Sequence, residues 1–318
     1  MLLLTGATGF IGGHVLERLE GPVRCLVRRS APLPHGRGSV ASCHGDLITG
    51  EGLDEALRDV DTIIHLAGAT KALRREDYYT GNVRATENLA RRAAARGIRF
   101  VHVSSQAAAG PSLDGAPVTE DDEPHPVSEY GRSKLEAERI VRGLIPAAVI
   151  LRPPVVYGPR DTAVLQLLKS VARGFWVEMA GGERWFSSIY VEDLAEGILT
   201  AAQAPQAAGR TYFLSHAKAS TWGDLAAAAG RVMERRPLHV RVPAAAAVAT
   251  GWCAEAWARI TGRPGIVSRD KIAEARCRSW VCDATRAAQE LGFEARTTLD
   301  AGIERTLAWC KEAGWIRY

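Results

Sequence analysis

The sequence predicts an α/β fold in which a doubly wound parallel sheet carries a smaller C-terminal lobe. Three observations lead to this class. A short apolar run over residues 1–4 is followed at once by a glycine-rich turn and by apolar residues at helical spacing over 14–19. Strand-like and helix-like segments then alternate as far as residue 151, and repeated units of this length imply right-handed crossovers with helices on both faces of the sheet. Beyond Pro153 the alternation loosens, which indicates a second, less regular part.

Each element follows from the period of its apolar residues. Short apolar runs that end at glycine or polar residues indicate strands. The expected strands are 1–4, 23–27, 39–43, 62–66, 99–103, 148–151 and 211–214. Apolar residues three and four apart indicate helices. The expected helices are 14–19, 53–57, 82–96, 130–141, 164–173, 191–203, 222–235, 244–260, 284–291 and 300–311.

Composition and charge exclude several classes of protein. The chain has 318 residues, of which 47% are hydrophobic and 24% are charged, as is usual for a water-soluble globular protein. Its 34 arginines and 6 lysines are spread among acidic residues, and the net charge is only +4. We therefore expect no nucleic-acid surface. The six cysteines form no C-x-x-C pair and no metal-ligand spacing, so we expect no metal site and reduced thiols.

Two apolar stretches bear on where in the cell the protein is located. A strand that starts at the initiator Met leaves no room for a signal peptide, so we expect a cytoplasmic protein. The Ala-rich stretch 242–260 is interrupted by Glu255 and Arg259. We interpret it as a buried or cleft-lining helix and expect no membrane span.

The glycine-rich turn predicts a dinucleotide site. Gly6, Gly9 and Gly12 have the spacing G-x-x-G-x-x-G between a strand and a helix. One glycine permits the tight turn, one lets the backbone approach a pyrophosphate, and one lets the helix pack closely on the strand. The free amides and positive end of the helix then hold the phosphates. The alternative is an ordinary turn between a strand and a helix.

The end of the second strand bears on which dinucleotide binds. An NAD site usually has Asp or Glu there to accept a hydrogen bond from the ribose 2′-hydroxyl. Here Arg28 and Arg29 follow the strand, and a guanidinium pairs with a 2′-phosphate that a carboxylate would repel. We expect NADP in preference to NAD, with Arg28 ahead of Arg29. The alternative is two solvated arginines.

Three side chains are the candidate catalytic group. Tyr130 and Lys134 are four residues apart, on one face of a helix. A nearby ammonium favours the phenolate form of a tyrosine, whose ordinary pKa is about 10. Ser105 ends the fifth strand and can donate to the same substrate oxygen. Taken singly, the pair at this spacing is more often exposed and the serine more often a strand end.

These motifs resemble the extended short-chain dehydrogenase/reductases, nearest the 3β-hydroxysteroid dehydrogenase and dihydroflavonol reductase branch. The resemblance covers nearly the whole chain, in the family's order. It includes the segments TGATGFIG at 5–12, GDL at 45–47, HLAG at 65–68, VSS at 103–105, Tyr130-x-x-x-Lys134, LRPPVVYGP at 151–159 and YVEDLA at 190–195.

The resemblance implies the roles of further residues. The cofactor site takes in the turn with Thr8, Phe10 and Ile11, while Asp46 and Leu47 flank the adenine. Leu66, Ala67 and Gly68 line the cofactor, and Pro153 to Val156 pass the nicotinamide. Asn82 matches the family's helix asparagine and is placed at the start of its helix, where a bare asparagine is more often an N-cap. Ser105 matches the catalytic serine better than Ser104, because Gly110 follows five residues later.

Domain organisation follows from these assignments. We place a dinucleotide-binding Rossmann domain at 1–158, with its sheet completed by parts of 190–216. Residues 159–318 form mainly a substrate-binding lobe. The apolar faces of 82–96 and 130–141 permit a homodimer, which is usual in the resembling family.

Two positions separate the branches of that family. The nucleotide-sugar branch has Arg where this chain has Phe186, although Arg184 lies two residues away, and Asn where this chain has Val155. Apolar replacements suit a less polar substrate. The pocket would then be lined by Trp176, Trp185, Phe186, Trp252 and Trp257, for which ordinary core packing is the alternative.

We therefore expect an NADP-dependent oxidoreductase that interconverts a ketone and a secondary alcohol on a small, fairly apolar substrate. Tyr130 exchanges the proton, Lys134 tunes it and binds the ribose, and Ser105 orients the carbonyl. The alternatives are a nucleotide-sugar epimerase or dehydratase, in which the cofactor stays bound, and a non-enzymatic NADP-binding sensor.

Overall fold

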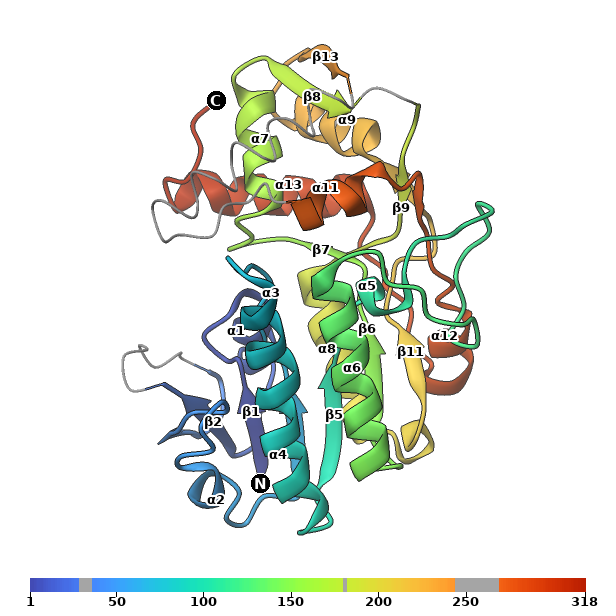
Figure 1. Ribbon diagram of the computed structural model, residues 1–318. Helices are drawn as coiled ribbons and strands as arrows, with labels where there is room; N and C mark the ends of the chain where they lie inside the picture. Colours follow the sequence, from blue (N-terminus) through green and yellow to red (C-terminus); the bar gives the residue numbers. More distant parts are fainter. Residues whose placement is uncertain (29–35, 180–181, 244–268) are drawn as a thin grey trace.

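A parallel sheet of seven strands forms the centre of the computed structural model, which describes residues 1–28, 36–179, 182–243 and 269–318. The strand order is β11-β6-β5-β4-β1-β2-β3, and every pair in it is parallel (Figure 1). The strands are β1 Leu2–Thr5, β2 Val23–Val27, β3 Val40–His44, β4 Thr62–His65, β5 Arg99–Val103, β6 Val149–Arg152 and β11 Thr211–Phe213. This confirms the predicted doubly wound α/β class.

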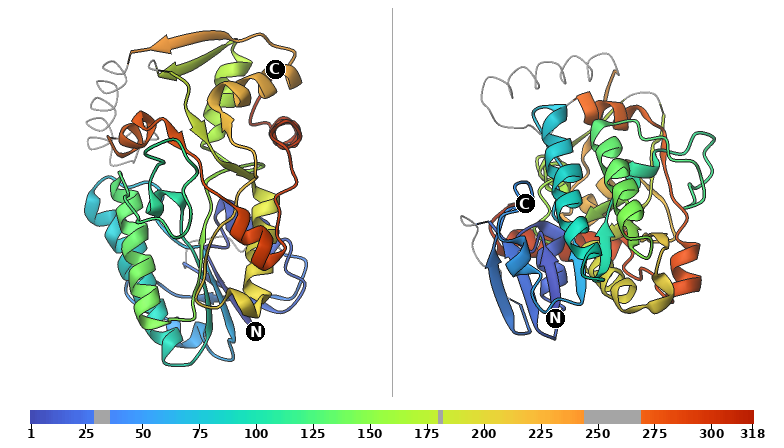
Figure 2. Two further views of the ribbon diagram at one scale, coloured as in Figure 1. Left: turned by 90° about the vertical axis from the view of Figure 1, so that its right-hand side faces the viewer. Right: turned by 60° about the horizontal axis from the view of Figure 1, so that its bottom comes forward.

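Helices cover both faces of this sheet (Figure 2, left). α4 and α6 lie side by side on one face, and α1 packs against α8 on the other. The helical elements around the sheet are α1 Phe10–Leu16, α2 Leu53–Ala56, α3 Arg75–Tyr78, η1 Tyr79–Arg84, α4 Ala85–Ala94, α5 Gln106–Ala109, α6 Glu129–Leu144, α8 Val191–Gln203, η2 Pro205–Ala207 and α12 Thr285–Leu291.

Alternation of side chains along the strands builds a core on each face. Leu3 packs with Phe100 and Leu89 on the α4 side, whereas Leu4 packs with Val15 and Ile198 on the α1 side. Successive strand residues point to opposite faces, so the central strands of the sheet need apolar residues at most positions. A fully buried Leu or Phe contributes roughly 1.5–3 kcal/mol. The continuous apolar runs in the sequence follow from this two-sided burial.

The C-terminal lobe lies beyond the carboxyl ends of the strands and has its own core. We use this name for the elements β7 Val155–Tyr157, α7 Val164–Ala172, β8 Phe175–Met179, β9 Trp185–Phe186, β10 Ser188–Tyr190, β12 Ser220–Thr221, α9 Trp222–Val232, β13 Leu238–Val242, α11 Arg269–Arg276, β14 Ser279–Trp280 and α13 Leu299–Glu312. Leu168, Leu225 and Ile303 are fully buried at its centre. In Figure 1 this lobe stands above the sheet, with α11 and α13 directly over the strand ends.

A buried ion pair fixes α6 to the sheet. Arg152, the last residue of β6, donates to both carboxylate oxygens of Glu138 on α6, at 3.1 and 2.7 Å. Both side chains are less than 10% exposed. A bidentate pair at such a site defines both the distance and the rotation of the helix, and α6 carries Tyr130 and Lys134 in its first two turns.

Predicted and observed elements differ mainly at helix starts and in the C-terminal lobe. The strands 23–27 and 99–103 and the helix 191–203 have the predicted bounds. The helix predicted at 82–96 begins earlier, because α3, η1 and α4 form a continuous helical run from Arg75 to Ala94. The short strands β7 to β10 and β12 to β14, and the helices α3, α5 and α11, were not predicted. The helix expected at 244–260 lies outside the described residues. In the described part of the chain, no helix combines the length and apolarity needed to span a membrane.

Candidate active site

The glycine turn between β1 and α1 is packed too tightly for other residues. Gly6 has a φ of +77°, in the region that favours glycine, and a Cβ there would lie 2.8 Å from the amide nitrogen of Ala67. A Cβ on Gly12 would lie 2.1 Å from the carbonyl oxygen of Gly6. The glycines therefore let α1 approach the end of β1, as the spacing predicts. Thr8 and Gly9 are exposed at the open end of the turn, next to Phe10 and Ile11 in the first turn of α1.

Strand order aligns the predicted cofactor residues along one edge of the sheet. Asp46 and Leu47 follow β3, Arg28 follows β2, the glycine turn follows β1, Leu66 to Gly68 follow β4, and Ser105 follows β5. These strands are neighbours in that order. At about 4.8 Å between strands, the row spans roughly 19 Å. An extended dinucleotide fits a row of this length that has a cradle for phosphate at its centre.

Local contacts hold the two ends of this row. At one end, Asp46 accepts hydrogen bonds from the amides of Ile48 and Thr49, which fixes the turn after β3. At the other end, the carbonyl oxygen of Pro153 accepts from the amide of Gln106, and Val156 pairs with Ile189 between β7 and β10. Arg28 is exposed, and Arg29 lies outside the described residues.

Asn82 does not start its helix, contrary to the prediction. It lies in η1, a π-helical turn inside the continuous run from α3 to α4, and it is 1% exposed. Its side chain accepts from the amide of Ala69 at 2.7 Å and donates to the carbonyl oxygen of Ala69 and to Ser133 Oγ. A π-turn widens the helix locally and is common at functional sites. Here it directs the amide between the segment after β4 and the helix that carries Tyr130.

Tyr130 and Ser105 meet at the carboxyl end of β5. Ser105 caps α5, because its Oγ accepts from the amide of Ala107 at 3.2 Å, and its side chain lies close enough to the Tyr130 hydroxyl to lower the pKa of that group. Ser104 is buried, and its Oγ has no hydrogen-bond partner within the described part of the chain. The geometry therefore brings Ser105, the serine that the sequence favoured, to the tyrosine.

Lys134 lies one helical turn further along α6. Its Nζ donates to the carbonyl oxygen of Val103 at 2.9 Å, and the residue is only 5% exposed. A Cβ on Gly68 would lie 3.9 Å from this Nζ and 2.8 Å from Asn82 Oδ1, so the three residues surround one point. Burial lowers the pKa of Lys134 to about 8, and the Glu138 carboxylate partly offsets this.

Two stacked histidines lie in the sheet beside Lys134. His65 on β4 and His102 on β5 have ring centroids 5.4 Å apart, and both are fully buried. Burial, with the charge of Lys134 as a second cause, lowers the pKa of His65 to about 3 and that of His102 well below its ordinary value. Both rings are therefore neutral at physiological pH, and Lys134 is the charged group at this position.

The helix α11 adds a set of contacts that the sequence did not indicate. Asp270 accepts hydrogen bonds from the amides of Glu129 and Tyr130, at 2.9 and 3.0 Å. Glu274 accepts from the hydroxyl of Ser128, the N-cap of α6, at 2.7 Å. Lys271 Nζ lies 5.6 Å from the centroid of the Tyr130 ring. About 140 residues separate these partners in the chain, so no local pattern could pair them.

The pKa of Tyr130 reflects these neighbours. Burial raises it above the ordinary value, whereas the charge of Lys271 and the hydrogen bond with Ser105 lower it, and Glu274 raises it further. The net shift is upward, so the hydroxyl is protonated at neutral pH. The charge that lowers the pKa of Tyr130 is therefore that of Lys271 on α11 and not, as the spacing on α6 predicts, that of Lys134.

Comparison with known proteins identifies the family. A model described as the NAD dependent epimerase/dehydratase family matches residues 2–214, which is more than half of the chain. The chain belongs to this family. The extended short-chain dehydrogenase/reductase resemblance is thereby confirmed, and the protein is an enzyme of a superfamily that depends on a nicotinamide dinucleotide.

Relatives in the NAD dependent epimerase/dehydratase family have more than one activity. A ceramide reductase of Caulobacter vibrioides (strain NA1000 / CB15N) is 31% identical over 320 residues, covering 99% of this chain and 96% of that protein. An N-acetyl-alpha-D-glucosaminyl-diphospho-ditrans,octacis-undecaprenol 4-epimerase of Escherichia coli O157:H7 is 27% identical, with 97% and 94% covered. Reductases and epimerases are therefore both similar to this chain.

Solved structures agree with the family assignment. The crystal structure of gox2253 has a TM-score of 0.82 and 26% identity, and the alignment covers 100% of this chain and 99% of that one. MoeE5 in complex with UDP-glucose and NAD has a TM-score of 0.78 and 25% identity, with 98% and 99% covered. The same sheet and C-terminal lobe are thus shared over nearly the whole length.

The residues that distinguish branches of the NAD dependent epimerase/dehydratase family are now located. Phe186 is 2% exposed and packs against Trp222, with ring centroids 4.4 Å apart, and Trp176 is 6% exposed. Both belong to the core of the C-terminal lobe, so the expectation that they line a pocket is wrong and core packing holds. Trp185 is 44% exposed, and Trp252 and Trp257 lie outside the described residues. Arg184 donates to the carbonyl oxygen of Ala275 in α11 at 2.8 Å.

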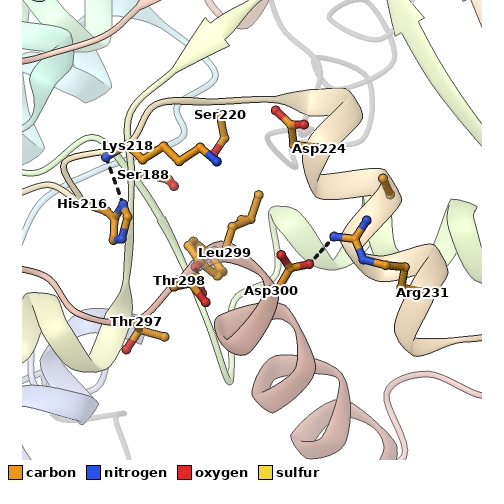
Figure 3. A pocket seen from close by; sticks show the side chains of 12 residues that line it. Ser188, His216, Lys218, Ser220, Asp224, Arg231, Thr297, Thr298, Leu299 and Asp300 are labelled. Carbon is orange, nitrogen blue, oxygen red and sulfur yellow. Dashed lines mark hydrogen bonds and ion pairs between the residues drawn. The ribbon is translucent and has the colours of Figure 1, made fainter.

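A polar hollow of about 310 Å³ lies in the C-terminal lobe between α9, α13 and the segment 216–220 (Figure 3). Arg231 and Asp300 form an ion pair at its wall, and the amide of Lys218 donates to His216. Its lining residues are Tyr157, Ser188, His216, Lys218, Ser220, Asp224, Ala227, Arg231, Thr297, Thr298, Leu299 and Asp300. None of them is among the predicted catalytic or cofactor residues.

Proposed function

We propose that this protein is an NADP-dependent oxidoreductase that interconverts a ketone and a secondary alcohol on a fairly apolar substrate. The observation that carries the proposal is that Tyr130 and Ser105 meet at the carboxyl end of β5, with Lys134 one helical turn along α6. In this proposal a proton donor, a second hydroxyl and a cation stand at one end of the row of predicted cofactor residues. Such a set suits proton exchange with an oxygen whose carbon gains or loses hydride.

Each side chain has a distinct part in reduction. The bound nicotinamide dinucleotide supplies the hydride. Tyr130 donates its proton to the carbonyl oxygen, and Ser105 donates a hydrogen bond that orients the same oxygen. Lys134 keeps a positive charge one helical turn further along α6, where it can bind the ribose of the nicotinamide. Because the pKa of Tyr130 lies above its ordinary value, chiefly through burial, the tyrosine is protonated at neutral pH and suited to donate.

Preference for NADP rests on the end of β2. Arg28 occupies the position where an NAD site usually has a carboxylate, and it is exposed. Its guanidinium can pair with a 2′-phosphate at two points. MoeE5 binds NAD, so a test of both cofactors is part of the proposal.

An apolar substrate is supported by two substitutions and one relative. Val155 and the buried Phe186 replace the amide and the guanidinium of the nucleotide-sugar branch, and Arg184 is hydrogen-bonded to α11. The Caulobacter relative is a ceramide reductase. We therefore propose a carbonyl on a long-chain lipid-like molecule as the substrate class.

A nucleotide-sugar epimerase is the second candidate function, favoured by the E. coli relative and by MoeE5. The two candidates differ in what happens to the cofactor. A reductase consumes NADPH in proportion to product, whereas an epimerase recycles a bound cofactor and leaves free NADPH unchanged.

The experiment compares the purified wild type with Tyr130→Phe and, as a matched control, Tyr318→Phe at the C-terminus. NADPH absorbance is followed with long-chain 3-oxo lipids, and UDP-sugars are tested for epimerisation by chromatography. We expect NADPH consumption with the lipids, its loss by a factor of at least about 10² in Tyr130→Phe, and no change in the control. Cofactor affinity should be unchanged in all three proteins. Epimerised UDP-sugar with no NADPH consumption would reverse the order of the two candidates.

A further inference from the structure

Beyond the motifs that resemble a known family, the structure brings a second ammonium to Tyr130. Lys271, on α11, places its Nζ 5.6 Å from the centroid of the tyrosine ring, within the range of a cation–π contact. Its side chain is 45% exposed, and its ammonium pairs with Glu274 on the same helix. Lys134 lies on the tyrosine's own helix and donates to the Val103 carbonyl oxygen. Lys271 therefore reaches the tyrosine ring from an element other than the tyrosine's own helix.

The position of α11 is fixed by contacts with the first turn of α6. The Asp270 carboxylate accepts from the amides of Glu129 and Tyr130, and the Glu274 carboxylate accepts from the hydroxyl of Ser128. A carboxylate at a helix N-terminus is favourable because it satisfies amides that have no partner inside the helix. These contacts hold α11 against the first turn of α6, which includes the candidate proton donor Tyr130.

Within α11 the charges are arranged so that Lys271 stays protonated. Its Nζ pairs with Glu274 at 2.7 Å. Burial is the largest single influence and lowers the pKa of Lys271, but the Glu274 carboxylate, with smaller contributions from Tyr130 and Asp270, raises it, and the net shift is upward. The ammonium is therefore charged throughout the neutral range.

The charged and titratable groups that face Tyr130 come from three elements. Lys134 lies on α6 itself, and Tyr78 on α3 has its ring centroid 6.0 Å from that of Tyr130. Asp270, Lys271 and Glu274 come from α11. The charge of Lys271 lowers the pKa of Tyr130 and that of Glu274 raises it, with Lys271 the larger of the two.

We propose that Lys271 is a further positioning residue of the active site, whose ammonium stabilises the Tyr130 phenolate formed when the tyrosine gives up its proton. The inference rests on the proposed function, since it assigns Lys271 a part in proton transfer by Tyr130. In reduction, hydride from the nicotinamide adds to the carbonyl carbon, the tyrosine O–H bond breaks and the substrate O–H bond forms. The phenolate then recovers a proton from solvent. Lys271 acts on the charged state of the tyrosine and transfers no atom.

The test measures the ionisation of Tyr130 without substrate or cofactor. Tyrosine labelled with ¹³C at Cζ is titrated by NMR, and Tyr130→Phe assigns the resonance. We expect Lys271→Gln to move the Tyr130 titration to higher pH and Lys271→Arg to leave it near that of the wild type. Glu274→Gln, which keeps an acceptor oxygen for Ser128, should move the titration to lower pH. Opposite shifts for the two charges are not expected from a merely structural role.

Lys311→Gln is the matched control, because Lys311 Nζ lies 5.3 Å from the ring centroid of Tyr318 at the far end of the chain. It should leave Tyr130 unchanged. With an active substrate, Lys271→Gln should lower kcat at neutral pH by about tenfold, with KM unchanged and activity recovered in Lys271→Arg. The inference would be overturned if Tyr130 titrates at the wild-type pH in Lys271→Gln. If Lys271→Gln does not fold, the Tyr130 titration in Glu274→Gln decides the question instead. If no substrate is found, the titration still gives the answer.

Discussion

Lys134 and Val103 are joined by a 2.9 Å hydrogen bond from the ammonium nitrogen to the backbone carbonyl oxygen at the end of β5. The bond holds a charged group in a site that is only 5% exposed. An amine that is buried in this way favours its neutral form, and the pKa of Lys134 falls to about 8. The protein thus keeps a destabilising charge at a position where the proposed reaction uses it.

This charge predicts a specific dependence of stability on pH. The pKa of Lys134 is about 8 in the folded state and has its ordinary value of 10.5 in the unfolded state. Between these values the unfolded chain binds the extra proton, so the free energy of unfolding of the wild type rises with pH. Relative to Lys134→Met, the rise should total about 3 kcal/mol. Urea unfolding of both proteins at pH 7.5, 9 and 10.5 measures it, and a difference that stays constant over this range would contradict the prediction.

Two Gly→Ala changes in helices should have opposite effects on stability, because Gly12 is packed against the glycine turn and Gly143 faces open space. In Gly12→Ala the new Cβ meets the Gly6 carbonyl oxygen at 2.1 Å, so α1 must move away from β1. We expect a loss of about 3 kcal/mol in the free energy of unfolding and loss of NADPH binding. Gly143, on α6, is exposed and has no atom within 4 Å of an added Cβ, so Gly143→Ala should gain about 0.5–1 kcal/mol and bind the cofactor normally. Chemical denaturation and NADPH fluorescence report on both, and a stable, cofactor-binding Gly12→Ala protein would show that the turn relaxes.

Reversing the charge of Arg28 should change the choice of cofactor. In Arg28→Glu a carboxylate stands where the 2′-phosphate of NADP is expected, so affinity for NADPH should fall by at least about tenfold and affinity for NADH should rise. Because Arg28 is exposed, the effect should shrink as salt is added. Arg173→Glu, an exposed position in the C-terminal lobe, is the control. If Arg28→Glu binds each cofactor with the same affinity as the wild type, a residue other than Arg28 must contact the 2′-phosphate.

Local sequence patterns predicted the sheet well because its central strands are buried on both faces, whereas only the edge strand β3 is largely exposed among the seven. The runs at 23–27 and 99–103 follow Gly21-Pro22 and Gly97-Ile98 and matched the observed strands, and the regular apolar spacing of 191–203 matched α8. The C-terminal lobe was predicted less well. Its strands β9, β12 and β14 have two residues each, too few to show a period.

In the candidate site, too, features set by neighbouring residues were predicted and contacts between distant residues were not. The three glycines, the four-residue spacing of Tyr130 and Lys134, and Ser105 at a strand end are visible in the sequence because each depends on neighbouring residues. The π-turn at Asn82 was not predicted, because it is associated with hydrogen bonds to Ala69 and Ser133 and not with a local helix propensity. Phe186 was assigned to a pocket, but its partner Trp222 lies 36 residues along the chain and draws it into a core.

The sequence by itself determined the α/β class, the cradle for a dinucleotide and the spacing that sets a phenol and an amine on one helix face, because strand period, turn geometry and helix pitch are local properties of the chain. Only the tertiary structure decided which groups surround that phenol. The row of strand ends follows from the order of the strands, and Asp270, Lys271 and Glu274 reach Tyr130 because α11 folds back across about 140 residues. Such contacts form where two surfaces are complementary in charge and hydrogen bonding, and neither surface exists until the chain has folded.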